Sequence, residues 1–427
     1  MINILIILFG KTFSFLSKRF NLGHGSTWPG HIALKLNPNF TNQILNKSKT
    51  EVILVTGTNG KTTTAKLLQT ILETNGKKVI LNDSGANLLN GIASTIILNS
   101  KLNGNLEADF AIFEVDENTL PQVTKTITPN YIIALDLFRD QLDRYGEIDT
   151  IARKWKDAYK SLKNTQFILN ADDPQIAFLG NGLTTAHYFG LDSKGNNIEE
   201  HAADSLLCPK CANRLTFKTH YFSHLGDWSC AKCGLKRPNR EINADLFLPL
   251  RGTYAIYDIQ AAALLAKLTG LTTEQINQGL KNFRPAFGRQ EIIKIEDKNI
   301  QLFLSKNPTS FNESLRTIAG NNAANLLIVL NDRIPDGTDV SWIWDIDFES
   351  LIKKNMNLYL AGDRVYDLAL RIKYSDVNIL EENIFENLSE AIGKGMLETK
   401  ANETFYILPT YSAMLETRKI ITGKKIL

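Results

Sequence analysis

The segment TGTNGKTTT, which runs from Thr56 to Thr64, combines glycine, lysine and threonine as phosphate-binding loops do. In such loops the backbone N–H groups hold phosphate oxygens, a lysine such as Lys61 adds positive charge, and the next hydroxyl, here that of Thr62, can hold Mg²⁺. The common G-x-x-x-x-G-K-[ST] spacing is broken, because Val55 stands where that pattern has its first glycine. The segment therefore predicts a phosphate site built on a shortened loop.

The residues on either side of this loop predict the elements that would position it. Glu51 to Val55 form a short apolar run that is typical of a buried strand. After Lys61 the apolar residues recur at helical spacing, and Gly76 stands where that helix should end. A strand, a glycine-rich turn and a helix are the context in which a helix N-terminus binds phosphate. The alternative, an ordinary turn between a strand and a helix, is disfavoured by this combination.

A second cluster consists of the chain's four cysteines, which lie in one segment at Cys208, Cys211, Cys230 and Cys233. The C-x₂-C-x₁₈-C-x₂-C spacing is typical of a zinc ribbon, in which two tight turns each supply two thiolates. Two disulfides, or four unrelated thiols, are the alternatives. His220 and His224 lie between the two pairs and could be ligands, although we expect them at the surface. With every thiol assigned to zinc, no cysteine remains to act as a nucleophile.

Carboxylates follow a third apolar segment, DFAIFEVDE, from Asp109 to Glu117. We expect a buried strand here, and the end of such a strand beside a phosphate loop is where an acid that binds metal belongs. Glu114 is the predicted Mg²⁺ ligand, and Asp116 is the neighbour that could serve instead. A solvated acidic strand end is the structural alternative.

The pattern along the whole chain predicts an α/β protein. Apolar runs alternate with helical patterns from about residue 50 to 205, which indicates a mostly parallel sheet covered by helices. The segments IQLFL, NLLIVL, LYLAG and TFYIL predict a second, smaller Rossmann-like sheet with LSEAIGKGML and YSAMLETRKII as helices. We therefore expect a short N-terminal segment (residues 1–48), a central phosphate-binding domain (residues 49–290) with a zinc-ribbon insertion at about 204–240, and a C-terminal domain (residues 291–427).

Composition limits the classes of function. A net charge of +3 over 427 residues does not argue for nucleic acid. No run approaches the roughly 18 apolar residues of a membrane span. The apolar start, Ile4 to Phe9, is short for a signal peptide, so we expect a cytoplasmic protein. We favour an N-terminal helix packed on the body of the protein, and contact with a membrane surface through Lys11, Lys18 and Arg19 is the sharper alternative.

Several motifs together resemble one family. TGTNGKTTT, FEVDE, FRDQLDRYGEID, LNADDP and FGRQE look like the signature set of the Mur ligase superfamily, which includes the folylpolyglutamate synthetases. The shortened G-T-N-G-K-T loop is the form that this superfamily uses. The four-cysteine insertion, SKNPTSFNESL and DGTDVSWIWD are similar to one branch, the synthetase subunits of lipid II amidotransferases. The resemblance covers nearly the whole chain.

This resemblance implies a reaction and roles for named residues. Enzymes of the branch use ATP to activate the α-carboxylate of D-glutamate in lipid II as an acyl phosphate, and ammonia then gives D-isoglutamine. The ammonia comes from a GatD-like glutaminase subunit in a heterodimer. Carried over by motif, the residues that would bind ATP are Gly57, Thr58, Asn59, Gly60, Lys61, Thr62, Thr63 and Arg289. Thr62 and Glu114 would hold Mg²⁺, and Lys61 would also be catalytic.

The same resemblance assigns a catalytic role to one aspartate of the second domain. Asp339, which precedes the Ser-Trp pair in DGTDVSWIWD, would complete the catalytic triad of the glutaminase across the interface. From the residues alone the choice stays open, since the same stretch also contains Asp332, Asp336 and Asp345.

The chain departs from the family pattern beside the nucleotide. Mur-type chains usually have G-x-x-N-x-x-N, and this one reads Gly252-Thr-Tyr-Ala-Ile-Tyr-Asp258, with Ala255 and Asp258 at the asparagine positions. Asp136 also stands where the branch tends to have asparagine. We expect altered contacts with the nucleotide but retained use of ATP. A stand-alone amino-acid ligase is the main functional alternative, and a P-loop ATPase with a nucleic-acid-binding ribbon is disfavoured by the loop variant and the modest charge.

Overall fold

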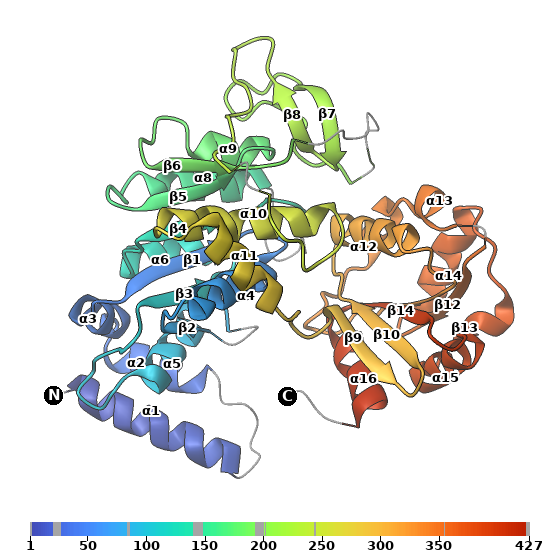
Figure 1. The fold of residues 1–427 in the computed structure, drawn as a ribbon, viewed down its shortest axis with the longest axis horizontal. Coiled ribbons are helices and arrows are strands. Elements are labelled where there is room, and N and C mark those ends of the chain that lie inside the picture. Colours follow the sequence, from blue (N-terminus) through green and yellow to red (C-terminus); the bar gives the residue numbers. More distant parts are fainter. Residues whose placement is uncertain are drawn as a thin grey trace.

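The computed structural model describes residues 2–19, 27–82, 86–139, 148–192, 200, 202–242, 245–353 and 355–423. In this part of the chain two α/β units, each built around a six-stranded sheet, lie side by side, and a two-stranded hairpin projects from the first unit (Figure 1). The predicted motif FRDQLDRYGEID falls mostly on residues 140–147, which lie outside the described residues.

The first sheet is entirely parallel, with the strand order β2-β3-β1-β4-β5-β6. Its strands are β1 (Glu51–Thr56), β2 (Val79–Leu81), β3 (Phe110–Glu114), β4 (Tyr131–Ala134), β5 (Gln166–Asn170) and β6 (Ala186–Phe189). The predicted parallel sheet is therefore confirmed. Strand β1, which leads into the phosphate loop, lies between β3 and β4. A site at the end of β1 can therefore receive side chains from both neighbouring strands.

Helices cover both faces of this sheet. Val52 and Leu54 of β1 face one core, and Ile53 and Val55 face the other, as the alternation of a strand requires. The helices of the second core are α4 (Lys61–Thr74), α10 (Thr253–Leu268) and α11 (Thr273–Asn282). Those of the first core are α5 (Leu89–Asn99), α6 (Leu120–Thr126), α8 (Ile148–Tyr159) and α9 (Pro174–Leu179).

Three helices at the start of the chain extend the first core. They are α1 (Ile2–Arg19), α2 (Trp28–Leu36) and α3 (Phe40–Lys47), of which only α1 was predicted from the sequence. Helix α2 lies against α5 at Gly30, where a Cβ would come within 1.9 Å of the Asn90 carbonyl oxygen. Helix α1 packs on both of them, which confirms the predicted packing on the body of the protein. Among the described helices, none has the length and apolar character needed to cross a bilayer.

The hairpin consists of β7 (Thr216–Phe222) and β8 (Leu225–Ser229), which pair antiparallel. It is attached to the carboxyl end of β5 by two hydrogen bonds. The Gly226 N–H donates to the Asp172 carbonyl (3.1 Å), and the Trp228 indole N–H donates to the Ala171 carbonyl (3.0 Å). The hairpin is therefore tied to the edge of the sheet where ligands bind in open α/β folds.

The second sheet has the order β13-β12-β11-β14-β10-β9, and only the β9–β10 pair within it is antiparallel. Its strands are β9 (Arg289–Ile295), β10 (Lys298–Phe303), β11 (Asn325–Val329), β12 (Asn357–Ala361), β13 (Ile384–Phe385) and β14 (Thr404–Pro409). The helical elements around it are α12 (Pro308–Gly320), η1 (Ser341–Asp345), α13 (Phe348–Leu351), α14 (Val365–Tyr374), η2 (Glu381–Asn383), α15 (Leu388–Glu398) and α16 (Tyr411–Thr422). The predicted strands and helices of this unit are confirmed, whereas β9 and β13 were not predicted.

Candidate active site

The phosphate loop occupies the turn between β1 and α4, as the sequence predicted. Gly60 has a left-handed backbone (φ 80°), and a Cβ there would lie 2.1 Å from the Asp258 carboxylate. A Cβ on Gly57 (φ 140°) would approach the Leu135 Cβ within 2.9 Å. Only glycine fits these two positions without moving its neighbours. Helix α4 begins at Lys61, so its first N–H groups face a cavity of about 700 Å³.

Two oxygen ligands for a hard cation meet at the end of this loop. The Thr62 hydroxyl donates a 2.8 Å hydrogen bond to the Glu114 carboxylate. Glu114 ends β3 directly beside Val55, and its backbone N–H donates to the Asn82 side chain. Burial raises the pKa of Glu114, while the bond from Thr62 opposes that rise. A buried hydroxyl and carboxylate are the donor set that Mg²⁺ prefers, and the pair therefore fits the metal that the family implies.

Lys61 is held inside the loop by a partner that the sequence analysis missed. Its ammonium group forms an ion pair with Glu117 (3.1 Å), and it also donates to the Thr58 carbonyl (3.2 Å) and the Gly57 carbonyl. Glu117 is itself buried, and its carbonyl accepts from the Trp155 indole N–H. Glu117 belongs to the motif FEVDE. Only the path of the chain after β3 shows which acid of this motif reaches Lys61.

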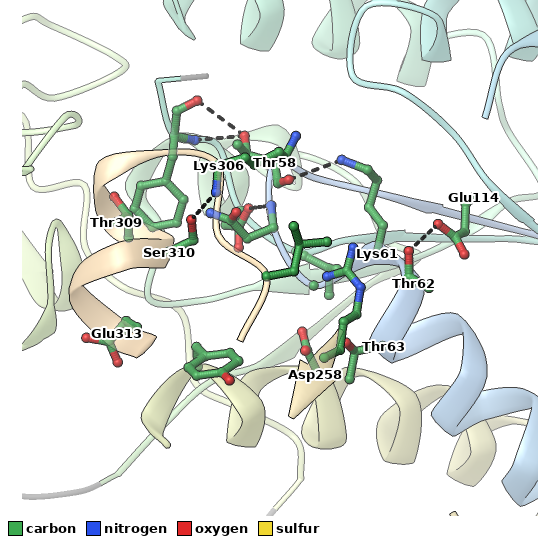
Figure 2. Close-up of a pocket in the computed structure, with 18 of the residues that line it drawn as sticks. Thr58, Lys61, Thr62, Thr63, Glu114, Asp258, Lys306, Thr309, Ser310 and Glu313 are labelled. Carbon is green, nitrogen blue, oxygen red and sulfur yellow. Dashed lines mark hydrogen bonds between the residues drawn. The ribbon is translucent and has the colours of Figure 1, made fainter. Parts of the chain in front are cut away.

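The second α/β unit supplies the opposite wall of the cavity. Figure 2 shows Lys306, Thr309 and Ser310 at the start of α12 facing the loop that carries Thr58 and Lys61. Two side chains join the walls directly, because the Asn307 amide donates a 3.1 Å hydrogen bond to the Asn59 side chain.

Asn307 also caps α12 by accepting from the Ser310 N–H at 2.9 Å. The motif SKNPTSFNESL was noticed in the sequence as a family signature, yet its contact with the phosphate loop was not predicted. The N-terminal N–H groups of α12 add to the positive end that α4 presents to the cavity.

Two acids stand at the positions where the sequence departs from the family pattern. Asp136 accepts from the Asn59 N–H (2.8 Å), and its own carbonyl accepts from the Thr58 N–H (3.1 Å). Loss of water around the Asp136 carboxylate raises its pKa to about 7. Asp258 is buried, and burial together with the nearby Asp136 carboxylate raises its pKa well above the usual value.

One oxygen of Asp258 accepts from the Thr64 hydroxyl (3.2 Å), and the other has no hydrogen-bond partner among the described residues. Both acids line the cavity. A protonated carboxyl group offers one donor and one acceptor, as an asparagine amide does. The substitution of asparagine by aspartate is therefore compatible with the same cavity shape.

All residues predicted to bind ATP line the cavity except Gly57. Thr58, Asn59, Gly60, Lys61, Thr62, Thr63, Glu114 and Arg289 all line the cavity. Gly57 lies just behind them and contributes its carbonyl to Lys61. Arg289 enters from the start of β9 and Lys306 lies just before α12, so both units bring cations to the cavity. The arrangement can hold a triphosphate between two helix N-termini and a metal-binding pair.

Asp339 lies outside this cavity, on the exposed loop that follows β11. Its carboxylate accepts from the Ser341 N–H (2.8 Å), which lowers its pKa. Pro335 in the same loop lines the cavity, so the loop connects the surface at Asp339 with the site.

The other aspartates of this stretch have partners within the chain. Asp336 is buried and accepts from the Ser412 N–H, Asp332 pairs with Arg364 (2.9 Å), and Asp345 lies 3.4 Å from Arg139.

The four cysteines form a compact cluster beside the hairpin. All four are free thiols, and their sulfur atoms lie within 4.8 Å of one another. The Cys208–Cys233 and Cys211–Cys230 sulfur pairs are 3.6 and 3.5 Å apart. A disulfide needs about 2.05 Å, whereas tetrahedral zinc with bonds of about 2.3 Å places its sulfur ligands about 3.8 Å apart. The cluster therefore fits a closed zinc site.

The two histidines between the cysteine pairs are not part of this cluster. His220 is partly exposed and stacks on Phe217. The expectation of a surface position is wrong for His224, which is fully buried against Phe138 with its Nε2 atom 3.5 Å from the Asp173 carboxylate. The reason is the tight connection between β7 and β8, which turns His224 inward toward the carboxyl end of β5.

Asp172 joins the cysteine-bearing segment to the nucleotide-binding unit. Arg237, four residues after the last cysteine, forms an ion pair with the Asp172 carboxylate. The same carboxylate accepts from the Tyr257 hydroxyl (2.8 Å) of α10 and from the Leu191 N–H (2.7 Å). Tyr257 lines the cavity, as does its neighbour Asp258, so Asp172 connects the cysteine-bearing segment with the wall of the cavity.

A shortened phosphate loop on a parallel sheet, closed by a second α/β unit, defines an ATP-dependent ligase of the Mur ligase type. The family models agree, since the Mur ligase middle domain matches residues 55–266 and the MurT ligase C-terminal domain matches residues 304–414. The chain is 33% identical to the MurT subunit of the lipid II isoglutaminyl synthase (glutamine-hydrolyzing) of Streptococcus pneumoniae, over 98% of this chain and 97% of that protein. The chain belongs to the MurT family.

Other relatives extend the comparison. The MurT subunit of Staphylococcus aureus (strain COL) is 30% identical over 85% of this chain and 86% of that protein. Among solved structures, a pseudomurein peptide ligase type C from Methanothermus fervidus superposes with a TM-score of 0.65 at 22% identity, over 88% of this chain and 79% of that chain. A MurF structure from Acinetobacter baumannii gives a TM-score of 0.64 at 18% identity, over 92% and 80%. These structures show that the fold is that of the Mur ligases.

We predict that the purified chain contains one zinc ion per molecule, held by the four cysteines. A strong chelator should lower the melting temperature by at least about 5 °C, because binding of a structural zinc ion contributes directly to folding. Elemental analysis and thermal unfolding check this. The variant Cys233→Ser is the control, since it should have the lower melting temperature before chelator is added. Absence of zinc, or disulfides seen by mass spectrometry, would contradict the prediction.

We predict that Asp136→Asn makes stability less dependent on pH. In the folded protein the Asp136 pKa is about 7, and its ordinary value is 3.8. Between these values the folded state binds more protons than the unfolded state, so the free energy of unfolding falls as pH rises, by at most ~1.4 kcal/mol per pH unit. Asparagine removes this fall while its oxygen can still accept from the Asn59 N–H.

Urea unfolding between pH 4 and pH 8 measures the difference for Asp136. The control is Asp157→Asn, a side chain that is 74% exposed and should leave the pH dependence almost unchanged. Parallel curves for Asp136→Asn and the unmodified protein would show that the Asp136 carboxylate does not titrate as described.

Proposed function

We propose that this protein is the synthetase subunit that amidates the α-carboxylate of D-glutamate in lipid II to D-isoglutamine, with ATP as the source of energy. The observation that carries the proposal is the shared cavity, in which a phosphate loop and a Thr62–Glu114 metal-binding pair face the start of α12. Its MurT relatives are named as subunits of lipid II isoglutaminyl synthases. Lipid II is therefore the substrate that the family relationship supports.

The reaction has two steps that balance without another reactant. An oxygen of the substrate carboxylate attacks the γ-phosphorus of ATP, the bond from that phosphorus to the β,γ-bridging oxygen breaks, and ADP leaves. The resulting acyl phosphate makes the carbonyl carbon open to attack by a neutral amine. Ammonia adds to that carbon, phosphate leaves with the electrons of the C–O bond, and one proton is lost as the amide forms.

The residues of the cavity have distinct tasks in these steps. The N–H groups of the loop and the Lys61 ammonium group hold the phosphates, and Lys61 stabilises the negative charge that develops during phosphoryl transfer. Arg289 adds a second cation from the other wall. Thr62 and Glu114 would hold Mg²⁺, which when bound neutralises phosphate charge. The bond between Asn307 and Asn59 joins the two walls, and closure of the cavity around its substrates would exclude the water that hydrolyses an acyl phosphate.

A second subunit supplies the ammonia in this proposal. Hydrolysis of glutamine by a class I-type glutaminase needs a nucleophilic thiol, and the four cysteines of this chain lie together in the cluster that would hold zinc. A GatD-like glutaminase would therefore bind at the loop after β11, where Asp339 could orient and stabilise its histidine. The loop suits this task, because Asp339 is exposed while Pro335 of the same loop lines the cavity. Exposed apolar side chains flank it, with Ile334 80% and Trp344 48% exposed.

The stand-alone amino-acid ligase is the competing assignment, because Mur ligases of that kind share the fold. An assay of ATP consumption with lipid II separates the two. The proposed subunit should consume ATP with ammonium as the nitrogen donor, whereas a stand-alone ligase should need a single amino acid. We place the reaction at the membrane surface that carries the lipid-linked substrate.

We predict that Lys61→Ala lowers ammonium-driven amidation by at least about a hundredfold, because it removes a cation from the transferring phosphoryl group. The matched control is Lys66→Ala, which lies further along α4 and outside the cavity, with its ammonium group bonded to Gln69. Thermal unfolding must show that the Lys61 variant is folded, since the change leaves buried Glu117 without its ion pair. Near-normal turnover in a folded Lys61→Ala protein would refute the assignment.

We predict that Asp339→Asn separates the two nitrogen sources in the complex with the glutaminase. Glutamine-driven amidation should fall at least about a hundredfold, because the partner's histidine loses its orienting carboxylate, while ammonium-driven amidation persists. Asp332→Asn is the control, since that carboxylate is paired with Arg364 within the chain. If both activities survive the Asp339 change, or both are lost in an intact complex, the role is wrong.

A further inference from the structure

The outward face of α1 has the polarity expected of a buried face. Beyond Ile2 and Ile4 at its start, the exposed positions of this helix follow the three- and four-residue spacing of one helical stripe: Leu5, Leu8, Phe9, Thr12, Phe15, Leu16 and Arg19. Five of these side chains are large and apolar, with exposed fractions of 61% for Leu5, 50% for Leu8 and Phe9, 68% for Phe15 and 45% for Leu16. We call these five side chains the α1 outer face.

The opposite side of α1 faces the protein core. Ile6 and Ile7 are buried there near the start of the helix, and the later buried positions carry small or polar residues. Gly10, Ser14 and Ser17 are buried there. Gly10 is closely packed, because a Cβ would lie 2.7 Å from Ile97 of α5 and 3.3 Å from Pro29 of α2. The helix is therefore held by Ile6, Ile7 and the small residues that follow them, while all three of its leucines and two of its three phenylalanines are exposed. A helix that only covered the core would carry mainly polar side chains on its outward face.

Within the part of the chain that the structure describes, the position of α1 leaves this face exposed. Figure 1 shows α1 lying along the outer edge of the molecule, with α2 and α5 between it and the first sheet. Contiguous exposed apolar side chains of this kind mark surfaces that bind protein or membrane. Helix α2 adds an exposed indole beside its own first turn, since Trp28 is 61% exposed.

The charge of the first fifty residues indicates which kind of partner suits the α1 outer face. None of the chain's 45 acidic residues lies in the first fifty positions. Six of its 48 basic residues do, at Lys11, Lys18, Arg19, Lys35, Lys47 and Lys49. Lys11 is held at the core by the Leu98 carbonyl (2.9 Å), whereas Arg19, Lys35 and Lys49 are exposed. An apolar helical face within a segment free of acids is complementary to a bilayer with anionic headgroups.

We propose that the α1 outer face docks on the surface of an anionic phospholipid bilayer, with α1 lying in the interface and its apolar side chains among the acyl chains. The biological role of this docking rests on the proposed function: docking would hold the cavity close to a substrate whose lipid lies in the same bilayer. The physical basis is independent of the reaction. It requires only the exposed apolar stripe and the surrounding excess of positive charge.

The test is co-sedimentation with vesicles that contain phosphatidylglycerol, without lipid II and without nucleotide. The variant Leu5→Ser/Leu8→Ser/Phe15→Ser changes three exposed side chains and should keep the melting temperature of the unmodified protein. Its partition onto the vesicles should fall at least about tenfold. Binding of the unmodified protein should weaken in high salt and on pure phosphatidylcholine vesicles, because the basic residues contribute by attraction to the headgroups.

The control variant is Leu102→Ser/Leu380→Ser/Leu397→Ser, which changes three exposed leucines elsewhere, with 53%, 54% and 79% exposure. It should bind vesicles as the unmodified protein does. If the unmodified protein stays in the supernatant, or if the α1 variant binds as well as the control, the proposal is overturned. It is also overturned if the α1 changes leave vesicle binding intact and instead dissociate a dimer in light scattering or release the glutaminase.

A second measurement separates this proposal from the reaction. With lipid II in detergent and ammonium as donor, the α1 variant and the unmodified protein should turn over equally, because the cavity is unchanged. With lipid II in vesicles, the α1 variant should be several-fold slower. Vesicle binding without any amidation would refute the proposed function and leave the docking surface standing. Amidation without vesicle binding would refute the docking surface and leave the proposed function standing.

Discussion

The chain must place a highly negative nucleotide in a cavity that its own carboxylates already make negative. The acids that line it, Glu114, Asp116, Asp136, Asp258 and Glu313, outnumber the cations Lys61, Arg289 and Lys306. Charge of one sign at such short range is costly away from water, so the surroundings must relieve it. Burial does so in part by raising the pKa of Glu114, Asp136 and Asp258 toward their neutral forms. The remaining relief comes from two helix N-termini and from the metal that Thr62 and Glu114 would hold.

This electrostatic demand explains why the site needs both α/β units. The first unit supplies the loop and Lys61, but Arg289 and Lys306 belong to the second. Their positions depend on short connections between the units. Gln290 donates to the Arg251 carbonyl and to the Tyr254 hydroxyl, both at 2.6 Å, and so fixes the start of β9 against α10. Together with the Asn307–Asn59 bond, this contact holds the second set of cations over the phosphate loop.

The sequence predicted what depends on local spacing and failed where distant segments meet. The phosphate loop, the strand before it and the four-cysteine cluster follow from patterns within a few residues, and each lies where it was expected. The pairing of Lys61 with Glu117, by contrast, depends on how the chain turns after β3. His224 was misplaced because the spacing of residues in a short hairpin does not show which side faces the sheet. The contact between Asn59 and Asn307 joins residues 248 positions apart, and no local pattern can reveal it.

The contacts of Asp172 link the cysteine-bearing segment to the nucleotide site. The Asp172 carboxylate binds Arg237 of the cysteine-bearing segment with one oxygen and Tyr257, the neighbour of Asp258, with the other. Asp172 therefore connects the segment that would hold zinc with residues that line the cavity. By thermodynamic reciprocity, whatever factor zinc contributes to nucleotide affinity, the nucleotide contributes the same factor to the retention of zinc. Zinc bound at the four cysteines would in this sense be an effector of the nucleotide site.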